Sequence, residues 1–192
     1  MVDIEIGKRG WARPHQAKLI EFFKAEGKKA FCLWHRKGGK DRVATFIESA
    51  LSVERVGLYW HALPKYEDAR KVIWDAITLE GERLIDVCFP APMVRRRLDH
   101  DMKLELVNGS IWQPVGADNF DSLVGAFPVN LTYSEFALMS PKARDYLRPA
   151  LAMNNGTELI VTTPRGYNHA HDLWLHAKQS SEWYTDMQTW RE

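Results

Sequence analysis

Trp34-His35-Arg36-Lys37-Gly38-Gly39-Lys40-Asp41 separates two contrasting segments of the sequence. The apolar run of residues 30–34 before it predicts a short buried strand, and the apolar residues of segment 42–51 recur at helical spacing. A strand, a glycine-bearing turn that ends in Gly-Lys, and a helix form the layout of a phosphate-binding loop. Glycines let main-chain N–H groups converge on an anion, and the helix N-terminus adds about half a positive charge. Lys40 at the end of the turn can then reach terminal phosphates.

The turn departs at two positions from the general pattern G-x-x-x-x-G-K-[ST]. Trp34 stands where the pattern has a glycine, and Asp41 stands where it has a serine or threonine. The loop alone therefore leaves a second interpretation open, in which Arg36, Lys37 and Lys40 are solvated residues of a basic surface turn. Residues further along the chain have to decide between the two.

The composition is typical of a globular protein. With 192 residues, 45% of them hydrophobic and 27% charged, the chain is expected to form one domain over 1–192 with a sizeable core. The net charge is +1, so any contact with nucleic acid has to use a local patch. No secretory signal is predicted, and no apolar run approaches the length of a membrane span, so no membrane contact is expected. Cys32 and Cys88 lack metal-site spacing and are expected to be buried thiols in a reducing compartment.

Predicted strands alternate with predicted helices, which indicates an α/β fold: a mainly parallel sheet with helices on both faces. Asn108-Gly109 lies between two strand-like runs and predicts a β-hairpin over about 102–115. Ser140 and Pro141 are typical of a helix start. The expected helices are 15–25, 42–51, 65–79, a segment from 141 and 168–178, and the expected strands are 30–34, 56–63, 102–107, 110–115, 128–133, 158–162 and 185–190.

Polar residues follow three of the predicted strands. In open parallel sheets, ligands bind at the carboxyl ends of the strands, and this rule gathers the loop 35–41, Ser134-Glu135 and Thr162-Thr163 at one edge. Hydrolysis of a nucleotide needs a phosphate cradle, a held magnesium ion and a group that orients water. Lys40 and the main chain of the loop would supply the cradle, and Glu135 is placed to polarise the attacking water. The alternative for Glu135 is a solvated acid beyond the end of a strand.

Four segments, in this order, resemble the ATPase domain of the large terminase subunit of tailed bacteriophages. Arg13-Pro14-His15-Gln16 resembles its adenine-recognition stretch. His35-Arg36-Lys37-Gly38-Gly39-Lys40-Asp41 resembles its variant of the Walker A loop, which lacks the first glycine and carries an arginine four residues before the lysine, here Arg36. Segment 125–136 is similar to the segment that contains Walker B. Thr162-Thr163-Pro164-Arg165-Gly166-Tyr167-Asn168-His169 is similar to the motif that couples hydrolysis to movement, and this is the most specific match.

The resemblance implies a P-loop NTPase fold of the ASCE type and an ATPase. Lys40 would bind the β- and γ-phosphates, Glu135 would activate water, and Arg36 would sense or stabilise the γ-phosphate. Gln16 would hydrogen-bond the adenine edge, and Thr162 and Thr163 would relay the state of the γ-phosphate. The implied nucleotide-binding residues are Gln16, Arg36, Lys37, Gly38, Gly39, Lys40, Asp41 and Arg42.

Two departures from the family concern the magnesium ion. Walker B ordinarily ends in Asp-Glu, whereas this chain has Ser134-Glu135, and Walker A ordinarily ends in a hydroxyl, whereas this chain has Asp41. We hypothesise that Asp41 carries the negative charge towards Mg²⁺ and that Ser134 offers a hydroxyl from the opposite strand, since Mg²⁺ favours oxygen ligands. The alternative is that Asp41 only caps its own helix. A third departure is Val124, where relatives often have an arginine that acts on a neighbouring subunit; Arg144 and Arg148 lie nearby.

The partners are also implied by the resemblance: double-stranded viral DNA pushed into a procapsid, the portal protein, the small terminase subunit, and further copies of the chain in a ring, in the host cytoplasm. In isolation a monomer is expected. A nuclease domain with clustered acidic residues usually follows in this family. This chain has no such cluster, so the nuclease domain is expected to lie outside these residues. Two other functions stay open: a helicase-like ATPase that depends on nucleic acid, and a nucleotide-binding module that has lost hydrolysis. Arg95-Arg96-Arg97 could touch DNA phosphates or be a solvated charge run.

Overall fold

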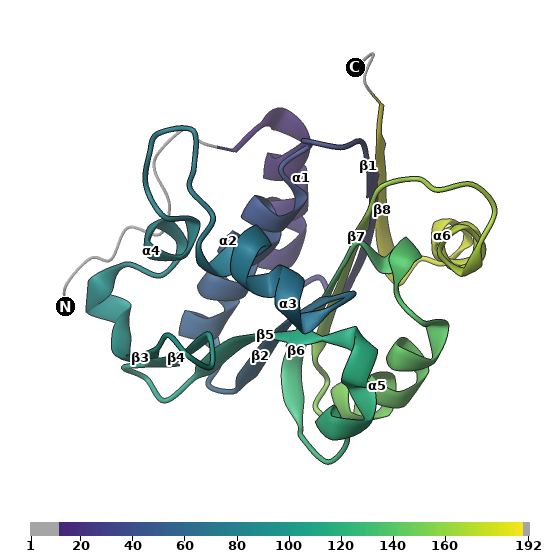
Figure 1. Cartoon of the computed structure of the whole chain (residues 1–192). Helices are drawn as coiled ribbons and strands as arrows, with labels where there is room; N and C mark the ends of the chain where they lie inside the picture. The colour runs from purple at the N-terminus through teal and green to yellow at the C-terminus, as the bar shows by residue number, and fades with distance from the viewer. Residues whose placement is uncertain (1–11, 190–192) are drawn as a thin grey trace.

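An eight-stranded sheet runs through the middle of the computed structural model, which describes residues 12–189 (Figure 1). Its strands are β1 (Lys29–Trp34), β2 (Leu58–Leu63), β3 (Val94–Leu98), β4 (Lys103–Leu106), β5 (Ile111–Gly116), β6 (Pro128–Ser134), β7 (Thr157–Thr162) and β8 (Trp183–Gln188). They lie in the order β3-β4-β5-β2-β6-β7-β1-β8. The neighbouring strands β5-β2-β6-β7-β1-β8 all pair in parallel, whereas β3 with β4 and β4 with β5 pair in antiparallel fashion. The predicted α/β fold with a mainly parallel sheet is therefore confirmed.

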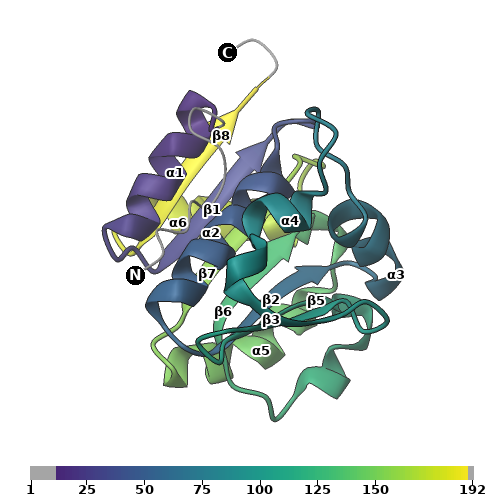
Figure 2. The ribbon, with the colours of Figure 1, turned by 90° about the vertical axis from the view of Figure 1, so that its left-hand side faces the viewer.

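Helices cover both faces of this sheet (Figures 1 and 2). The helices of one face are α1 (Pro14–Lys24), α2 (Lys40–Glu54), α3 (Tyr66–Ala69), its π-helical continuation η1 (Arg70–Trp74) and α4 (Leu84–Cys88). Those of the other face are α5 (Pro141–Met153) and α6 (His169–Gln179). Short 3₁₀ turns, η2 (Ala91–Met93), η3 (Ala117–Leu123) and η4 (Phe136–Leu138), complete the connections.

Strand β1 shows why the central strands are continuous apolar runs. Ala30, Cys32 and Trp34 pack with residues of α1 and α2, whereas Phe31 and Leu33 pack in the core that α5 and α6 cover. Because both faces of the strand are buried, it has no polar face to alternate with an apolar one. Cys32 is a free, buried thiol, as is Cys88. Within residues 12–189, no helix combines the length and the apolar character needed to cross a bilayer.

The segment between β2 and β5 differs most from the sequence-based prediction. The helix expected over 65–79 ends at Trp74, because η1 closes with the N–H of Asp75 bonded to the carbonyl of Arg70. Ile77 is 61% exposed and bridges to Arg83 instead of continuing an apolar helix face. Strand β3 is not predicted, because its run of arginines shows no alternation. The predicted hairpin is present, since β4 and β5 pair in antiparallel fashion across Asn108-Gly109.

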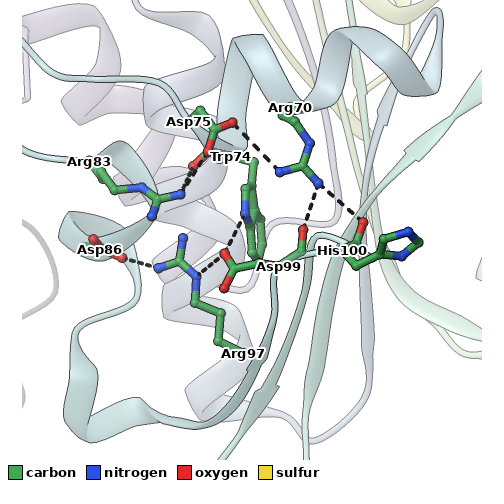
Figure 3. Close-up of polar contacts among 8 residues, drawn as sticks. All are labelled: Arg70, Trp74, Asp75, Arg83, Asp86, Arg97, Asp99 and His100. Carbon is green, nitrogen blue, oxygen red and sulfur yellow. Dashed lines mark hydrogen bonds and ion pairs between the residues drawn. The ribbon is translucent and has the colours of Figure 1, made fainter.

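The arginines of β3 are largely paired with acids of the same chain. Figure 3 shows Arg97 between two carboxylates, with Nη1 2.7 Å from Asp86 and Nε 3.0 Å from Asp99. Asp99 also accepts a hydrogen bond of 3.1 Å from the indole of Trp74, and Arg95 lies 3.2 Å from Glu105. Strand β3 is at the edge of the sheet, where charged side chains discourage pairing with another chain. This network gives Arg97 partners within the chain, whereas Arg95 is 64% exposed, so a contact of the run Arg95-Arg96-Arg97 with DNA phosphates stays a prediction.

Replacing Arg144 by alanine is expected to lower the free energy of unfolding by about 3–5 kcal/mol, because it leaves a buried charge without its partner. Nε and Nη2 of Arg144 lie 2.6 and 3.0 Å from the two carboxylate oxygens of Glu158, and both side chains are buried. Urea unfolding measures the loss. Arg148→Ala, at an exposed position one turn later in α5, is the matched control and should cost less than about 0.5 kcal/mol.

Equal losses of unfolding free energy in Arg144→Ala and Arg148→Ala would contradict this account of the Arg144–Glu158 pair. The same pair concerns Arg144, which the family resemblance leaves as a candidate for an arginine that acts on a neighbouring subunit. Glu158 lies near the amino end of β7, away from the carboxyl ends of the strands, and its carboxylate occupies the Arg144 guanidinium. Arg144 is therefore engaged within its own chain and is not available for that role.

Candidate active site

The carboxyl ends of β1, β6 and β7 meet at one edge of the sheet, because β7 lies between β1 and β6 and pairs in parallel with both. The turn after β1 leads to Lys40 at the start of α2, β6 ends at Ser134 just before Glu135, and β7 ends just before Thr163. Residues that are about 28 to 123 positions apart in sequence are thus brought into direct contact.

Lys40 lies at the centre of these contacts, and its side chain is only 5% exposed. Its Nζ lies 3.4 Å from Oε1 of Glu135 and donates a hydrogen bond of 3.0 Å to the Thr163 hydroxyl. A further bond of 3.3 Å goes to the carbonyl of His35 in the turn itself. Thr163 in turn donates a bond of 3.2 Å to Glu135, which closes a triangle of lysine, glutamate and threonine. An anion that replaces the Glu135 carboxylate could form charge-assisted hydrogen bonds with this buried ammonium group.

The turn between β1 and α2 has the backbone of an anion cradle. Lys37 has φ +64° and Gly39 has φ +75°, so both lie in the left-handed region. A side chain at residue 39 would be strained there, and its Cβ would lie 2.5 Å from the amide nitrogen of Gln16. Successive left- and right-handed residues turn main-chain N–H groups towards one point, and the N-terminus of α2 adds its own N–H groups. The glycine is therefore required by both conformation and space.

Gln16 fastens α1 to this turn. Its buried side-chain amide donates bonds of 3.0 Å to the carbonyl of Gly38 and 3.3 Å to that of Gly39, and its oxygen accepts a bond of 2.9 Å from the main chain of Arg13. The Arg13 guanidinium adds a bond of 3.0 Å to the carbonyl of Lys37. Gln16 therefore lies beside the turn, as the sequence predicts, but both of its amide hydrogens are directed at the loop. Its contact with adenine stays a prediction.

The remaining basic residues of the predicted site lie at its rim. The side chains of Arg36 and Lys37 are exposed on the turn. Arg42, in the first turn of α2, is partly buried and lies 3.9 Å from Glu80. Their positions leave Arg36 and Lys37 accessible to a nucleotide from the solvent side, and their roles stay predictions.

Glu135 is held in a conformation that non-glycine residues seldom adopt, with φ +52°. Two side chains secure the turn that follows it: the Thr162 hydroxyl accepts a bond of 3.1 Å from the N–H of Ala137, and the His169 ring lies 3.0 Å from the carbonyl of Phe136. Thr162 thus supports the glutamate indirectly, while Thr163 contacts it. The sequence did not single out His169 for this task, although it belongs to the predicted coupling segment.

Asp41 and Ser134 are also brought together, since the Ser134 hydroxyl donates a hydrogen bond to Oδ1 of Asp41. Nε2 of His61 lies 3.5 Å from the same oxygen. Burial by itself raises the pKa of Asp41, but the His61 contact, the Ser134 bond and the charge of Lys40 together lower it below its usual value. A carboxylate and a hydroxyl therefore lie beside the lysine at the start of α2.

This pair of oxygen donors fits Mg²⁺. The ion is usually held by one or two protein oxygens, with phosphates and water as its other ligands. Among the described residues 12–189, no group of three or more histidine, cysteine or acidic side chains could hold a metal by itself. Asp41 and Ser134 could hold such an ion only together with other ligands, and their role towards Mg²⁺ stays a prediction.

No protein-family model matches the chain. Over 178 residues, which cover 85% of the chain, it is 26% identical to the large terminase subunit of Thermus virus P23-45, and it spans 36% of that protein's length. The large terminase ATPase domain of Thermus phage P74-26 has a TM-score of 0.72 and 18% identity, over 93% of this chain and 82% of that one.

A large terminase from a thermophilic bacteriophage, solved in complex with ADP, has a TM-score of 0.73 and 13% identity, over 91% of this chain and 44% of that one. The overall fold described above is thus shared with solved structures of a large terminase and of a large terminase ATPase domain. These matches agree with the resemblance carried by the four sequence segments. The chain is similar in sequence to phage large terminase subunits and has the fold of their ATPase domains.

Proposed function

We propose that this chain is the ATP-hydrolysing motor domain of a large terminase, which drives double-stranded viral DNA into procapsids. The observation that carries the proposal is the contact of Lys40, Glu135 and Thr163 at the ends of three strands, beside a turn built to receive an anion. A phosphate cradle and an acid that orients water are two of the three parts that nucleotide hydrolysis requires, the third being a held magnesium ion. The similarity to large terminase subunits supports the same function.

The Lys40–Glu135 contact suggests how the site changes when ATP binds. The γ-phosphate carries more negative charge than a carboxylate, so it would take Glu135's place at the Lys40 ammonium. Glu135 would then be free to orient a water molecule and accept its proton as the water attacks the γ-phosphorus, giving ADP and phosphate. Thr163, which contacts both side chains, would detect the exchange, and Thr162 would pass it to the turn that follows Glu135.

The other predicted contacts complete the nucleotide site in this proposal. The exposed Arg36 would stabilise charge on the γ-phosphate, and Lys37 and Arg42 would contact the phosphates from the rim. Gln16 would meet the adenine edge after giving up a bond to the turn. Asp41 and Ser134 would hold Mg²⁺, which supplies positive charge against the phosphates when it is bound.

Replacing Asp41 by alanine is expected to reduce magnesium-dependent ATP turnover by about 10- to 100-fold, as losses of metal-supporting residues typically do. Phosphate release measured over a magnesium titration should show both a lower plateau and a higher half-saturating concentration. Asp172→Ala is the matched control, because Asp172 is also an acid in the first turn of a helix but is 81% exposed and lies 3.4 Å from His171. Equal effects of the two variants, or undiminished turnover in Asp41→Ala, would refute a role of Asp41 towards Mg²⁺. The alternative that Asp41 caps its own helix is not met in the structure, because the N-cap of α2 is Gly39.

The partners in this proposal are double-stranded DNA, the portal protein, the small terminase subunit and other copies of the chain in a ring on the procapsid, in the host cytoplasm. The whole chain, 1–192, would act as one motor domain. Phosphate release from ATP and Mg²⁺, measured with and without double-stranded DNA, tests the central claim. Release above the background of the buffer supports it. A chain that binds ATP but releases no phosphate would instead be a nucleotide-binding module, and stimulation by single-stranded nucleic acid alone would favour a helicase-like ATPase.

A further inference from the structure

Three charged or ionisable side chains lie close together behind the phosphate loop: Asp41, Glu48 and His61. The proposed mechanism uses only Asp41. His61 in β2 and Glu48 in α2 are both fully buried, and Asp41 lies at the start of the same helix. Nδ1 of His61 lies 2.9 and 3.2 Å from the two carboxylate oxygens of Glu48, and its Nε2 faces Asp41 at 3.5 Å. Buried ionisable groups are costly unless they are paired, so such a cluster calls for a reason.

The helix and the sheet fix this arrangement. Asp41 and Glu48 are seven positions apart in α2, which is about two turns, so both face the sheet from the same side of the helix. His61 comes from β2 between them: its Nδ1 is hydrogen-bonded to Glu48, and its Nε2, which has no hydrogen-bond partner, lies 3.5 Å from Asp41. Trp112, from the neighbouring strand β5, anchors the far end by donating a bond of 2.7 Å to Glu48. At the other end of this row of side chains, Ser134 of β6 donates a hydrogen bond to Asp41.

We infer that His61 is a positioning residue of the active site: it links the anchored Glu48 to Asp41 and so holds the Asp41 carboxylate against Ser134 at the start of α2. The inference rests on the proposed function. It explains how a carboxylate can occupy the position where the general loop pattern has a hydroxyl. A carboxylate beside bound phosphates has to point in a defined direction, and a ring packed behind it at 3.5 Å restricts that direction.

A purely structural role for His61 predicts something different. In that case the ring would only satisfy Glu48 in the core, and its loss would disturb the site to the same degree whatever residue stands at position 41. A positioning role makes the two residues interdependent. A double-mutant cycle separates these possibilities, because it measures whether one substitution changes the effect of the other.

The cycle compares wild type, His61→Asn, Asp41→Thr and the double variant. Asparagine keeps an amide near the Nδ1 position, where it can still meet Glu48, but is too short to reach Asp41. Threonine restores the hydroxyl of the general pattern. Equilibrium binding of a fluorescent ATP analogue, with and without Mg²⁺, is measured first, and kcat and KM for phosphate release second. Thermal unfolding of each variant reports separately on the core.

With Asp41 present, His61→Asn is expected to weaken magnesium-dependent binding of the analogue and to lower kcat, each by about 10-fold or more. With threonine at position 41, the same substitution should change either quantity by no more than about twofold. Equal fold-changes in the two backgrounds, or no effect in either, would overturn the inference. If His61→Asn does not fold, Glu48→Gln, which keeps an acceptor for Trp112, enters the same cycle with the same expected pattern.

Because the cycle measures binding of the analogue as well as turnover, it can fail independently of the test of the proposed function. A wild-type chain that binds the analogue but releases no phosphate would refute hydrolysis, and the binding cycle would still decide the role of His61. A wild-type chain that hydrolyses ATP while the cycle shows no coupling would retain the proposed function and refute the inference.

Discussion

Glu135→Gln is expected to slow phosphate release from ATP by about 100- to 10,000-fold, which is the usual contribution of a positioned general base. Glutamine has nearly the same shape and can still accept a hydrogen bond from Thr163, so the turn after β6 should keep its conformation. The amide carries no negative charge, so it cannot take a proton from water. It also cannot form the ion pair that Lys40 makes in the nucleotide-free protein.

The loss of that ion pair gives the variant a second, opposite signature. Because ATP no longer has to displace a carboxylate from Lys40, its affinity should be equal to or higher than that of the wild type. Phosphate release under single-turnover conditions and equilibrium binding of ATP measure the two effects on one preparation. Glu54→Gln, an exposed glutamate at the far end of α2, is the matched control and should change neither. Turnover that survives in Glu135→Gln would refute the assignment of the base.

Much of this geometry could be predicted from the sequence because it follows from local patterns and one rule of topology. The strand–turn–helix at residues 30–51 fixes where Lys40 lies, and the rule that ligands bind at the carboxyl ends of parallel strands brings Ser134-Glu135 and Thr162-Thr163 to the same edge. Asn108-Gly109 identifies the hairpin. The local patterns depend only on neighbours in sequence, and the topology rule needs only the order of strands and helices. Neither requires knowledge of contacts across the core.

Other parts could not be predicted, since they depend on contacts across the core. A single histidine in the apolar run of β2 does not reveal that His61 faces two acids of α2. The helix expected over 65–79 has the right apolar spacing, but Ile77 is drawn into a bridge with Arg83, and the π-helical turn ends the helix before it. Gln16 was predicted to lie at the site, yet only the structure shows it bonded to the turn itself.

Asp41 and Ser134 illustrate how two departures from a pattern can be read together. Each alone weakens the resemblance: one removes a hydroxyl from the loop, and the other removes a carboxylate from the end of β6. The structure brings the two side chains into hydrogen-bond contact, so the site as a whole still has one carboxylate and one hydroxyl, with their positions exchanged. A substitution at one position is therefore best judged against its partner in space.

Lys40→Ala is expected to weaken ATP binding by about two to four orders of magnitude, because the ammonium would make charge-assisted bonds to two phosphates, each contributing about 1.5–3 kcal/mol. The side chain of Lys40 contacts both Glu135 and Thr163. Its loss therefore removes the charge that would draw the γ-phosphate to the water-orienting acid. Equilibrium binding of a fluorescent ATP analogue measures the effect.

Lys24→Ala, at an exposed lysine in the last turn of α1, is the control and should leave binding unchanged. Lys40→Ala and Glu135→Gln also check each other. If the two residues act as proposed, the first loses binding and with it turnover, whereas the second loses turnover and keeps binding. A Lys40→Ala variant that binds the analogue as tightly as wild type would mean that the turn after β1 does not receive the phosphates. The contact between Lys40 and Glu135 would then be an ordinary buried ion pair, and the motor interpretation would lose the observation on which it depends.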